Sequence, residues 1–144
     1  MPEIPVVPAL WRFPAHPESV RRARHAVVEA LPYGLPAQLH AELGLITSEL
    51  VTNAIRHGAC ADADEVVELV LWPTDGHYWL AVSDPGTGEP VAHRGPRPDA
   101  ESGRGLLLVD ALADAWAVVP RSWRGKSVVA GLALPAAGLA AGPA

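Results

Sequence analysis

A carboxylate at the end of an apolar run is the first place where this sequence could do chemistry. Asp84 follows the stretch Tyr78-Trp79-Leu80-Ala81-Val82 after one serine, and a carboxylate there costs free energy unless it finds donors. One interpretation is a turn aspartate that begins Asp-Pro-Gly. The other makes Asp84 an acceptor for the exocyclic amine of a base, with Gly86 and Gly88 letting the backbone come close to a flat ligand.

A second candidate site lies where small residues lead into an apolar run. Gly103 and Gly105 come directly before Leu106-Leu107-Leu108-Val109. Small residues at a helix N-terminus expose N–H groups at the positive end of the helix dipole, which is a favourable place for phosphate. The alternative is a capping turn with Ser102 as the N-cap.

A third candidate is a row of polar residues. Glu49, Asn53 and His57 follow one another at intervals of four, so a helix would align them on one face. The row adjoins an apolar stripe and should not face bulk solvent. Taken alone, the spacing is typical of a polar boundary row beside a core.

A long segment joins the first two candidates. Pro85 to Arg104 are twenty residues with many glycines and prolines. Loops of that length are uncommon inside one domain and usually act as lids or binding loops. We therefore expect a lid at about 85–104 that covers a ligand.

The elements that position these residues follow from apolar periodicity and turn residues. The pattern predicts helices at Glu18–Leu31, Ala37–His57 and Leu106–Asp114, and strands at Leu10–Phe13, Glu65–Trp72, His77–Ser83, Ala115–Val119 and Lys126–Leu134. Asp75-Gly76 predicts a hairpin. This order favours an α+β, two-layer α/β sandwich with helices on one face of a mixed, mostly antiparallel sheet. We expect one domain at 9–135 between flexible ends at 1–8 and 136–144.

Together, the three candidates resemble a known arrangement. Glu49-Leu-Val-Thr-Asn53 on a helix, Asp84-x-Gly86-x-Gly88 after a strand and Gly103-x-Gly105 before a helix resemble the nucleotide-binding boxes of the GHKL, or Bergerat-fold, ATPases. Residues 10 to 134 follow the element order of that family. The resemblance covers almost the whole chain.

The resemblance implies ATP and Mg²⁺ as ligands and a role for each matching residue. Asn53 would bind Mg²⁺, Glu49 would be the general base and Asp84 would accept the adenine amine. Ser127 would support that carboxylate. The other nucleotide-contacting positions would be His57, Gly86, Gly88, Gly103, Arg104, Gly105 and Leu106.

Within that family, Thr47-Ser48-Glu49-Leu50-Val51-Thr52-Asn53-Ala54 and Ser102-Gly103-Arg104-Gly105-Leu106 are most similar to the anti-sigma-factor serine/threonine kinases. This implies phosphotransfer to a small antagonist protein, a sigma factor as second partner, and compatibility with a homodimer. Glu101 stands where those kinases tend to carry a basic residue, with Arg94, Arg97 or Arg104 as substitutes. A carboxylate beside a triphosphate is repulsive, so a non-catalytic, nucleotide-dependent binding module is the alternative.

Composition and charge limit the classes of partner that the chain is expected to bind. A net charge of −5 argues against direct nucleic-acid binding. The basic run Arg21, Arg22 and Arg24 is a solvated helix face or a partner-docking patch. Cys60 is the only cysteine, and no apolar run approaches the roughly 20 residues of a membrane span, so a cytoplasmic location is expected.

One further motif points elsewhere. Gly125-Lys126-Ser127 mimics the end of a phosphate-binding P-loop, but Pro120 stands where the first glycine is required. A strand, not a helix, is expected to follow. The motif therefore predicts a turn that enters a strand.

Overall fold

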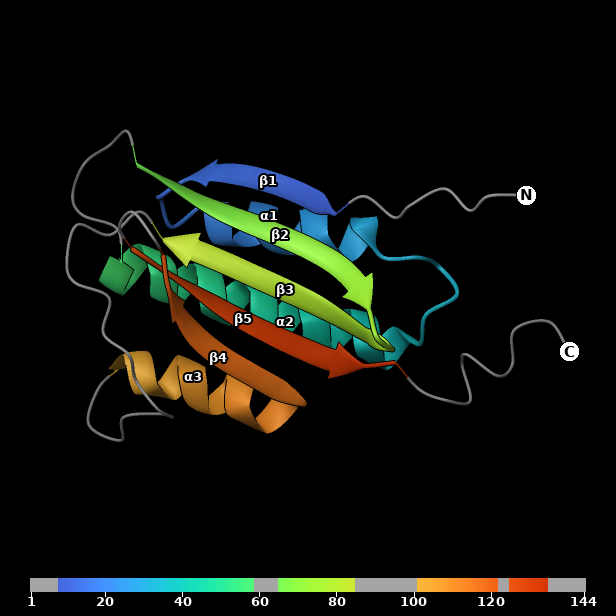
Figure 1. Cartoon of the computed structure of the whole chain (residues 1–144). Coiled ribbons are helices and arrows are strands. Elements are labelled where there is room, and N and C mark those ends of the chain that lie inside the picture. Colours follow the sequence, from blue (N-terminus) through green and yellow to red (C-terminus); the bar gives the residue numbers. More distant parts are fainter. Residues whose placement is uncertain (1–7, 59–64, 85–100, 122–124, 135–144) are drawn as a thin grey trace, which may run out of the picture.

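The computed structural model describes residues 8–58, 65–84, 101–121 and 125–134, with the backbone alone described at 57, 58 and 101–105. Elements follow the predicted order, and a short π-helical segment follows the second helix (Figure 1). The predicted ends at 1–8 and 136–144, apart from Pro8, and most of the predicted lid, 85–100, lie outside the described residues.

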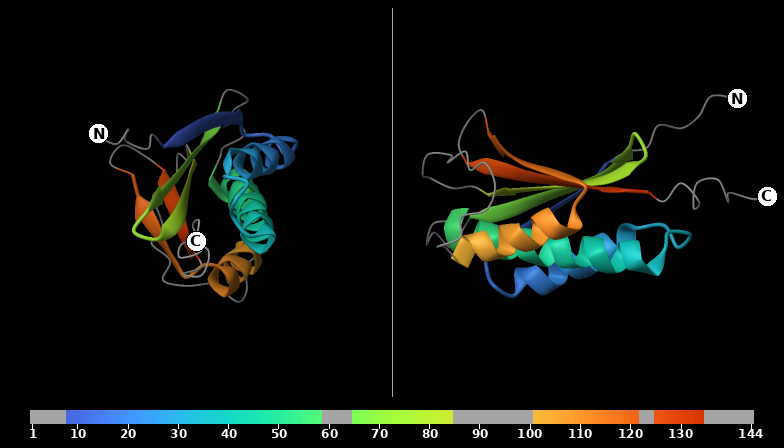
Figure 2. Two further views of the ribbon diagram at one scale, coloured as in Figure 1. Left: turned by 90° about the vertical axis from the view of Figure 1, so that its right-hand side faces the viewer. Right: turned by 90° about the horizontal axis from the view of Figure 1, so that it is seen from below.

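Five strands form one antiparallel sheet. They are β1 (Ala9–Pro14), β2 (Val66–Thr74), β3 (His77–Asp84), β4 (Ala115–Pro120) and β5 (Lys126–Ala133). Their order is β1-β2-β3-β5-β4, and all four pairings are antiparallel. The helices lie on one face of this sheet (Figure 2). The predicted α+β, two-layer fold is confirmed.

The β2–β3 hairpin turns at the predicted dipeptide. Asp75 and Gly76 have positive φ angles of 51° and 72°, as a two-residue turn between antiparallel strands requires. β2 extends further into the turn than predicted, because Pro73 and Thr74 pair with Tyr78 and His77, whereas β3 starts at His77 as predicted.

Side chains alternate between the two faces of the sheet. In β3, Tyr78, Leu80 and Val82 are buried in the core that the helices share. In β5, Val128, Ala130 and Leu132 are buried in the same core. The period of two continues to Asp84 and Lys126, which therefore lie on the helix-covered face.

The helices close this core through their apolar stripes. α1 (Ser19–Ala30) buries Ala23 and Val27, and α2 (Ala37–Asn53) packs against both α1 and α3 (Glu101–Leu112). Fully buried side chains of α2 include Leu43, Ile46, Thr47, Leu50 and Val51. α2 thus lies at the centre of the helical layer.

The predicted end of α2 and the predicted start of α3 were wrong. α2 ends at Asn53 and continues as the π-helical segment η1 (Ala54–Gly58), where an α-helix to His57 was expected. α3 begins at Glu101, so the last residues of the predicted lid are helical. Glycines lower helix propensity, which is why sequence reasoning placed the start after Gly105.

The other end of α3 also differs from its prediction. Asp114 was expected to be helical, but its backbone N–H donates to Gly131 O at 2.8 Å. Its carboxylate accepts a hydrogen bond from the Ala133 N–H at 2.5 Å. Both contacts tie Asp114 to β5, so the helix ends at Leu112.

Candidate functional site

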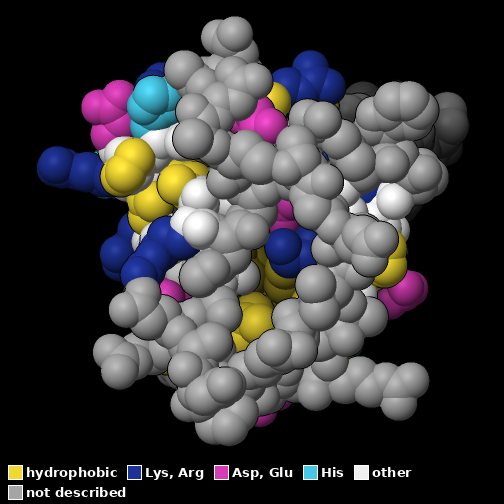
Figure 3. Space-filling model, turned by 90° about the vertical axis from the view of Figure 1, so that its left-hand side faces the viewer, with side chains coloured by type: hydrophobic (Ala, Val, Ile, Leu, Met, Phe, Trp, Pro, Cys, Tyr) yellow, Lys and Arg dark blue, Asp and Glu magenta, His cyan; other side chains and the backbone are white. Residues whose placement is uncertain are grey.

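The predicted site residues meet at one end of the molecule. The C-terminus of α2, η1, the end of β3, the beginning of β5 and the N-terminus of α3 all lie on the left of Figure 1. η1 contacts β3, and α2 contacts α3. Figure 3 views this end and shows acidic, basic and hydrophobic side chains of described residues there.

Asn53 brings an unpaired acceptor to this end. Only 8% of the residue is exposed, and its Oδ1 is buried with no hydrogen-bond partner among the described residues. Buried polar atoms are nearly always paired, so such an atom calls for an explanation. A carboxamide oxygen is a suitable ligand for Mg²⁺, so Asn53 fits the predicted metal.

Glu49 lies one helical turn before Asn53 and is half-buried. The α-helical part of the predicted row, Glu49 and Asn53, is therefore present on one face of α2. A carboxylate in this position could accept a proton from a hydroxyl group brought to the same end.

His57 lies in η1, beyond the α-helix. In a π-helix each hydrogen bond spans five residues, so the α-helical spacing that would align His57 with Asn53 does not continue. π-helical turns are rare and are frequently found at functional sites. The side chain of His57 lies outside the described residues, so its alignment with Asn53 stays a prediction.

Asp84 is the most deeply buried acidic group among the residues described at this end. Its Oδ2 lies 2.9 Å from Nζ of Lys126, and the two side chains are 4% and 18% exposed. The two residues are direct cross-strand partners in the β3–β5 ladder. The prediction that this carboxylate must find a donor is confirmed, and Lys126 is one such donor.

Gly125 makes this approach possible. Its φ of +82° belongs to the left-handed region, and a Cβ on it would lie 2.3 Å from Asp84 O. A glycine is therefore required where the chain enters β5 beside Asp84. The turn predicted for Gly125-Lys126-Ser127 is confirmed, and β5 follows it.

Ser127 was expected to support the Asp84 carboxylate, but its described side-chain partner is a different residue. It pairs with Ser83, and their hydroxyl oxygens are 2.5 Å apart. By the alternation of the strands this pair lies on the face away from the helices, opposite to Asp84. The geometry gives the supporting position to Lys126, which sequence reasoning missed. Lys126 is the single lysine of the chain, and this rarity was the sequence signal that could have drawn attention to it.

The beginning of α3 bears on the predicted phosphate site. The N–H groups of the first four helix residues have no intrahelical partner. Gly103 is one of these four residues, whereas Gly105 is the fifth residue of the helix. Leu106 is 6% exposed and belongs to the core. Gly86 and Gly88 lie outside the described residues, and so does the side chain of Arg104.

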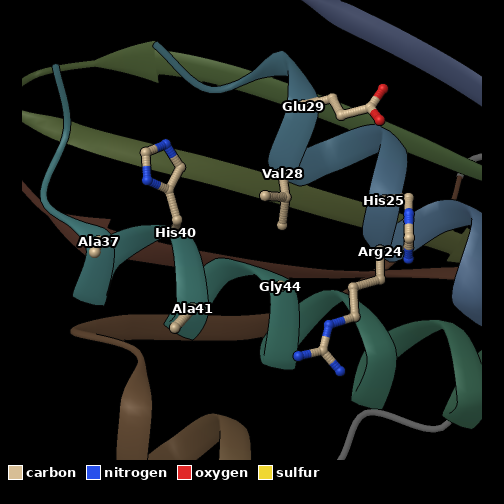
Figure 4. Close-up of a pocket in the computed structure, with 8 residues that line it drawn as sticks. All are labelled: Arg24, His25, Val28, Glu29, Ala37, His40, Ala41 and Gly44. Carbon is tan, nitrogen blue, oxygen red and sulfur yellow. The ribbon is translucent and has the colours of Figure 1, made fainter. Parts of the chain in front are cut away.

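A separate hollow lies between α1 and α2 (Figure 4). Its volume is 390 Å³, and its lining combines Val28 and three small residues with Arg24, His25, Glu29 and His40. None of the predicted site residues lines it. Arg21, Arg22 and Arg24 of the predicted basic run are all exposed.

Two negative findings apply to the described part of the chain. It contains no group of three or more His, Cys, Asp or Glu side chains that could hold a metal ion. None of its helices has both the length and the apolar character needed to cross a membrane.

Comparison with known proteins agrees with this geometry. The family model described as the histidine kinase-like ATPase domain matches residues 13–130. That range includes Glu49, Asn53, Asp84 and Lys126. No curated protein matches the chain.

Proposed function

The chain belongs to the histidine kinase-like ATPase domain family, and from that membership we propose that it is a regulatory serine/threonine kinase of the anti-sigma-factor type. The family supports ATP binding and, at a coarse level, ATP-dependent kinase-like activity. The proposal adds the acceptor, a Ser or Thr hydroxyl of a small antagonist protein, and a sigma factor as second partner.

The observation that carries the proposal is that two buried polar groups lie at the same end of the fold. Asp84 ends β3 on the covered face, and Asn53 ends α2 with a buried Oδ1 that has no hydrogen-bond partner among the described residues. One group suits the amine of a base and the other suits a cation. Mg²⁺, when bound, would neutralise charge on the phosphate oxygens.

The remaining roles follow the same geometry. Glu49, one turn before Asn53, would accept the proton of the acceptor hydroxyl as its oxygen bonds to the γ-phosphorus and ADP leaves. N–H groups at the start of α3, including that of Gly103, would contact phosphate oxygens. Gly86 and Gly88 would line the base, and Arg104 would meet the phosphates.

A second candidate function is a nucleotide-dependent binding module without turnover. Glu101 favours it, because α3 begins at this residue and a carboxylate at the phosphate end opposes a triphosphate. In that case ATP would bind and alter partner affinity without phosphotransfer. Both functions would suit the cytoplasm, where ATP is present and the lone Cys60 stays reduced.

One experiment separates these functions. Mg-ATP binding is measured by calorimetry, and phosphotransfer to candidate antagonist proteins is measured for the wild type and for Glu49→Ala. The kinase proposal expects both proteins to bind Mg-ATP and only the wild type to transfer phosphate. Binding without transfer by the wild type would favour the module, and absence of binding would reject both.

A further inference from the structure

Lys126 places a positive donor beside the acceptor that is expected to receive the base. Its Nζ is 2.9 Å from Asp84 Oδ2, and an ammonium group has three N–H donors. Within the described part of the chain, Lys126 donates to Asp84. An ionised carboxylate, in turn, can accept several hydrogen bonds. The contact between the two groups therefore does not use the full hydrogen-bonding capacity of either one.

The position of this pair is fixed by backbone as well as by charge. Asp84 and Lys126 are register partners on the helix-covered face of the sheet. Gly125 brings the start of β5 against the Asp84 backbone, closer than any residue with a Cβ could. The lysine stem is largely buried, since 18% of the side chain is exposed. The donor is thus held at the acceptor.

We propose that Lys126 is a second base-recognition residue, which donates a hydrogen bond to a ring nitrogen of adenine while Asp84 accepts the exocyclic amine. The inference rests on the proposed nucleotide site. Adenine carries an amine donor next to ring-nitrogen acceptors, whereas guanine carries an oxygen acceptor at the position of that amine. A carboxylate that accepts from the amine, beside an ammonium that donates to a ring nitrogen, matches the adenine pattern.

The test compares ATP with analogues that lack one ring nitrogen. Calorimetry measures the dissociation constants of ATP, 1-deaza-ATP and 7-deaza-ATP with the wild type and with Lys126→Met. A hydrogen bond from a charged donor corresponds to about a 10- to 150-fold change in affinity. The wild type should bind one of the two analogues more weakly than ATP by that factor. Lys126→Met should bind ATP and that analogue equally.

Two further variants guard against effects on folding. Arg12→Met removes the cation of an exposed cross-strand ion pair with Glu68 and should keep the wild-type preference for ATP. Lys126→Arg keeps a cation beside Asp84 but changes the position of the donors. Lys126→Arg should stay folded and show a smaller preference for ATP over the analogue than the wild type does. If Lys126→Met does not fold, this variant tests the role of Lys126 in its place.

The outcomes are distinct. Equal binding of ATP and both analogues by the wild type would overturn this inference and leave the proposed function standing. An equal loss of affinity for all three ligands in Lys126→Met would also overturn it, because Lys126 would then act only through Asp84. A wild type that binds none of the three would reject the proposed function and this inference with it.

Discussion

Two ion pairs in this sheet have nearly the same length and very different surroundings. Arg12 and Glu68 are cross-strand partners in β1 and β2, with Nε and Oε2 3.0 Å apart. Lys126 and Asp84 are cross-strand partners in β5 and β3, at 2.9 Å. The side chains of the first pair are 64% and 24% exposed, and those of the second are 18% and 4% exposed.

The sheet face explains this difference. Phe13, Val67 and Leu69 are buried on the covered face, so Arg12 and Glu68 lie on the other face by alternation. Exposed ion pairs contribute about 0–1 kcal/mol, because water screens the charges. Breaking a buried pair leaves a desolvated charge and costs several times more. The distance between charges therefore says less about their importance than the face on which they lie.

The largest expected effect comes from breaking the buried pair. Lys126→Met should lower the free energy of unfolding by about 3–5 kcal/mol, because the buried carboxylate of Asp84 loses Lys126 as an ion-pair partner. Urea denaturation measures this loss, with Arg12→Met as the matched control. Equal losses in the two variants would show that the face of the sheet does not decide the strength of the pair.

A smaller effect is expected on ligand binding from removing the charge of Asp84. Asp84→Asn should weaken ATP binding about 10- to 150-fold, since hydrogen bonds to charged groups contribute about 1.5–3 kcal/mol. Glu68→Gln removes the matching carboxylate of the exposed pair and should leave ATP affinity unchanged. Calorimetric titration checks both, and an unaltered dissociation constant for Asp84→Asn would contradict its role.

The next variant tests whether the buried amide of Asn53, at the end of α2, contributes to ligand binding or to stability. Asn53→Ala removes a buried oxygen that is unpaired among the described residues, so stability should not fall as it does in Lys126→Met. Removing a ligand of Mg²⁺ should lower ATP affinity in the presence of Mg²⁺ by about 10-fold and leave Mg²⁺-free binding unchanged.

Thr47→Val is the control for Asn53→Ala. The Thr47 hydroxyl is buried in α2 and donates to Leu43 O at 2.7 Å. Its removal should leave the effect of Mg²⁺ on ATP binding intact. If Asn53→Ala responds to Mg²⁺ as the wild type does, the metal role of Asn53 is wrong.

The smallest effect belongs to the exposed pair. Arg12→Met should lower the free energy of unfolding by less than about 1 kcal/mol, and the difference should shrink at high ionic strength. Denaturation at low and high salt measures this. A loss as large as that of Lys126→Met, and insensitive to salt, would show that Arg12 is more desolvated than its exposure indicates.

Most elements could be predicted because their signals are local. The apolar stripe of α2 and the alternation in β2 and β3 each repeat within a few residues, and Asp75-Gly76 fixes the hairpin turn. The start of α3 could not be placed from propensity alone, since helix formation there runs through two glycines. The π-helical turn at Ala54–Gly58 has no comparable sequence pattern.

The sequence by itself determined the order of elements, the two-layer arrangement and the residue types available for a nucleotide: Asn53 at a helix end and Asp84 at a strand end. Tertiary structure decided which neighbour each of them has. Ser127 and Lys126 are adjacent in sequence, but the register of β3 with β5 puts Lys126 opposite Asp84 and Ser127 opposite Ser83. Because successive side chains of a strand point to opposite faces, a shift of one residue exchanges the two, and only the pairing of distant strands sets that register.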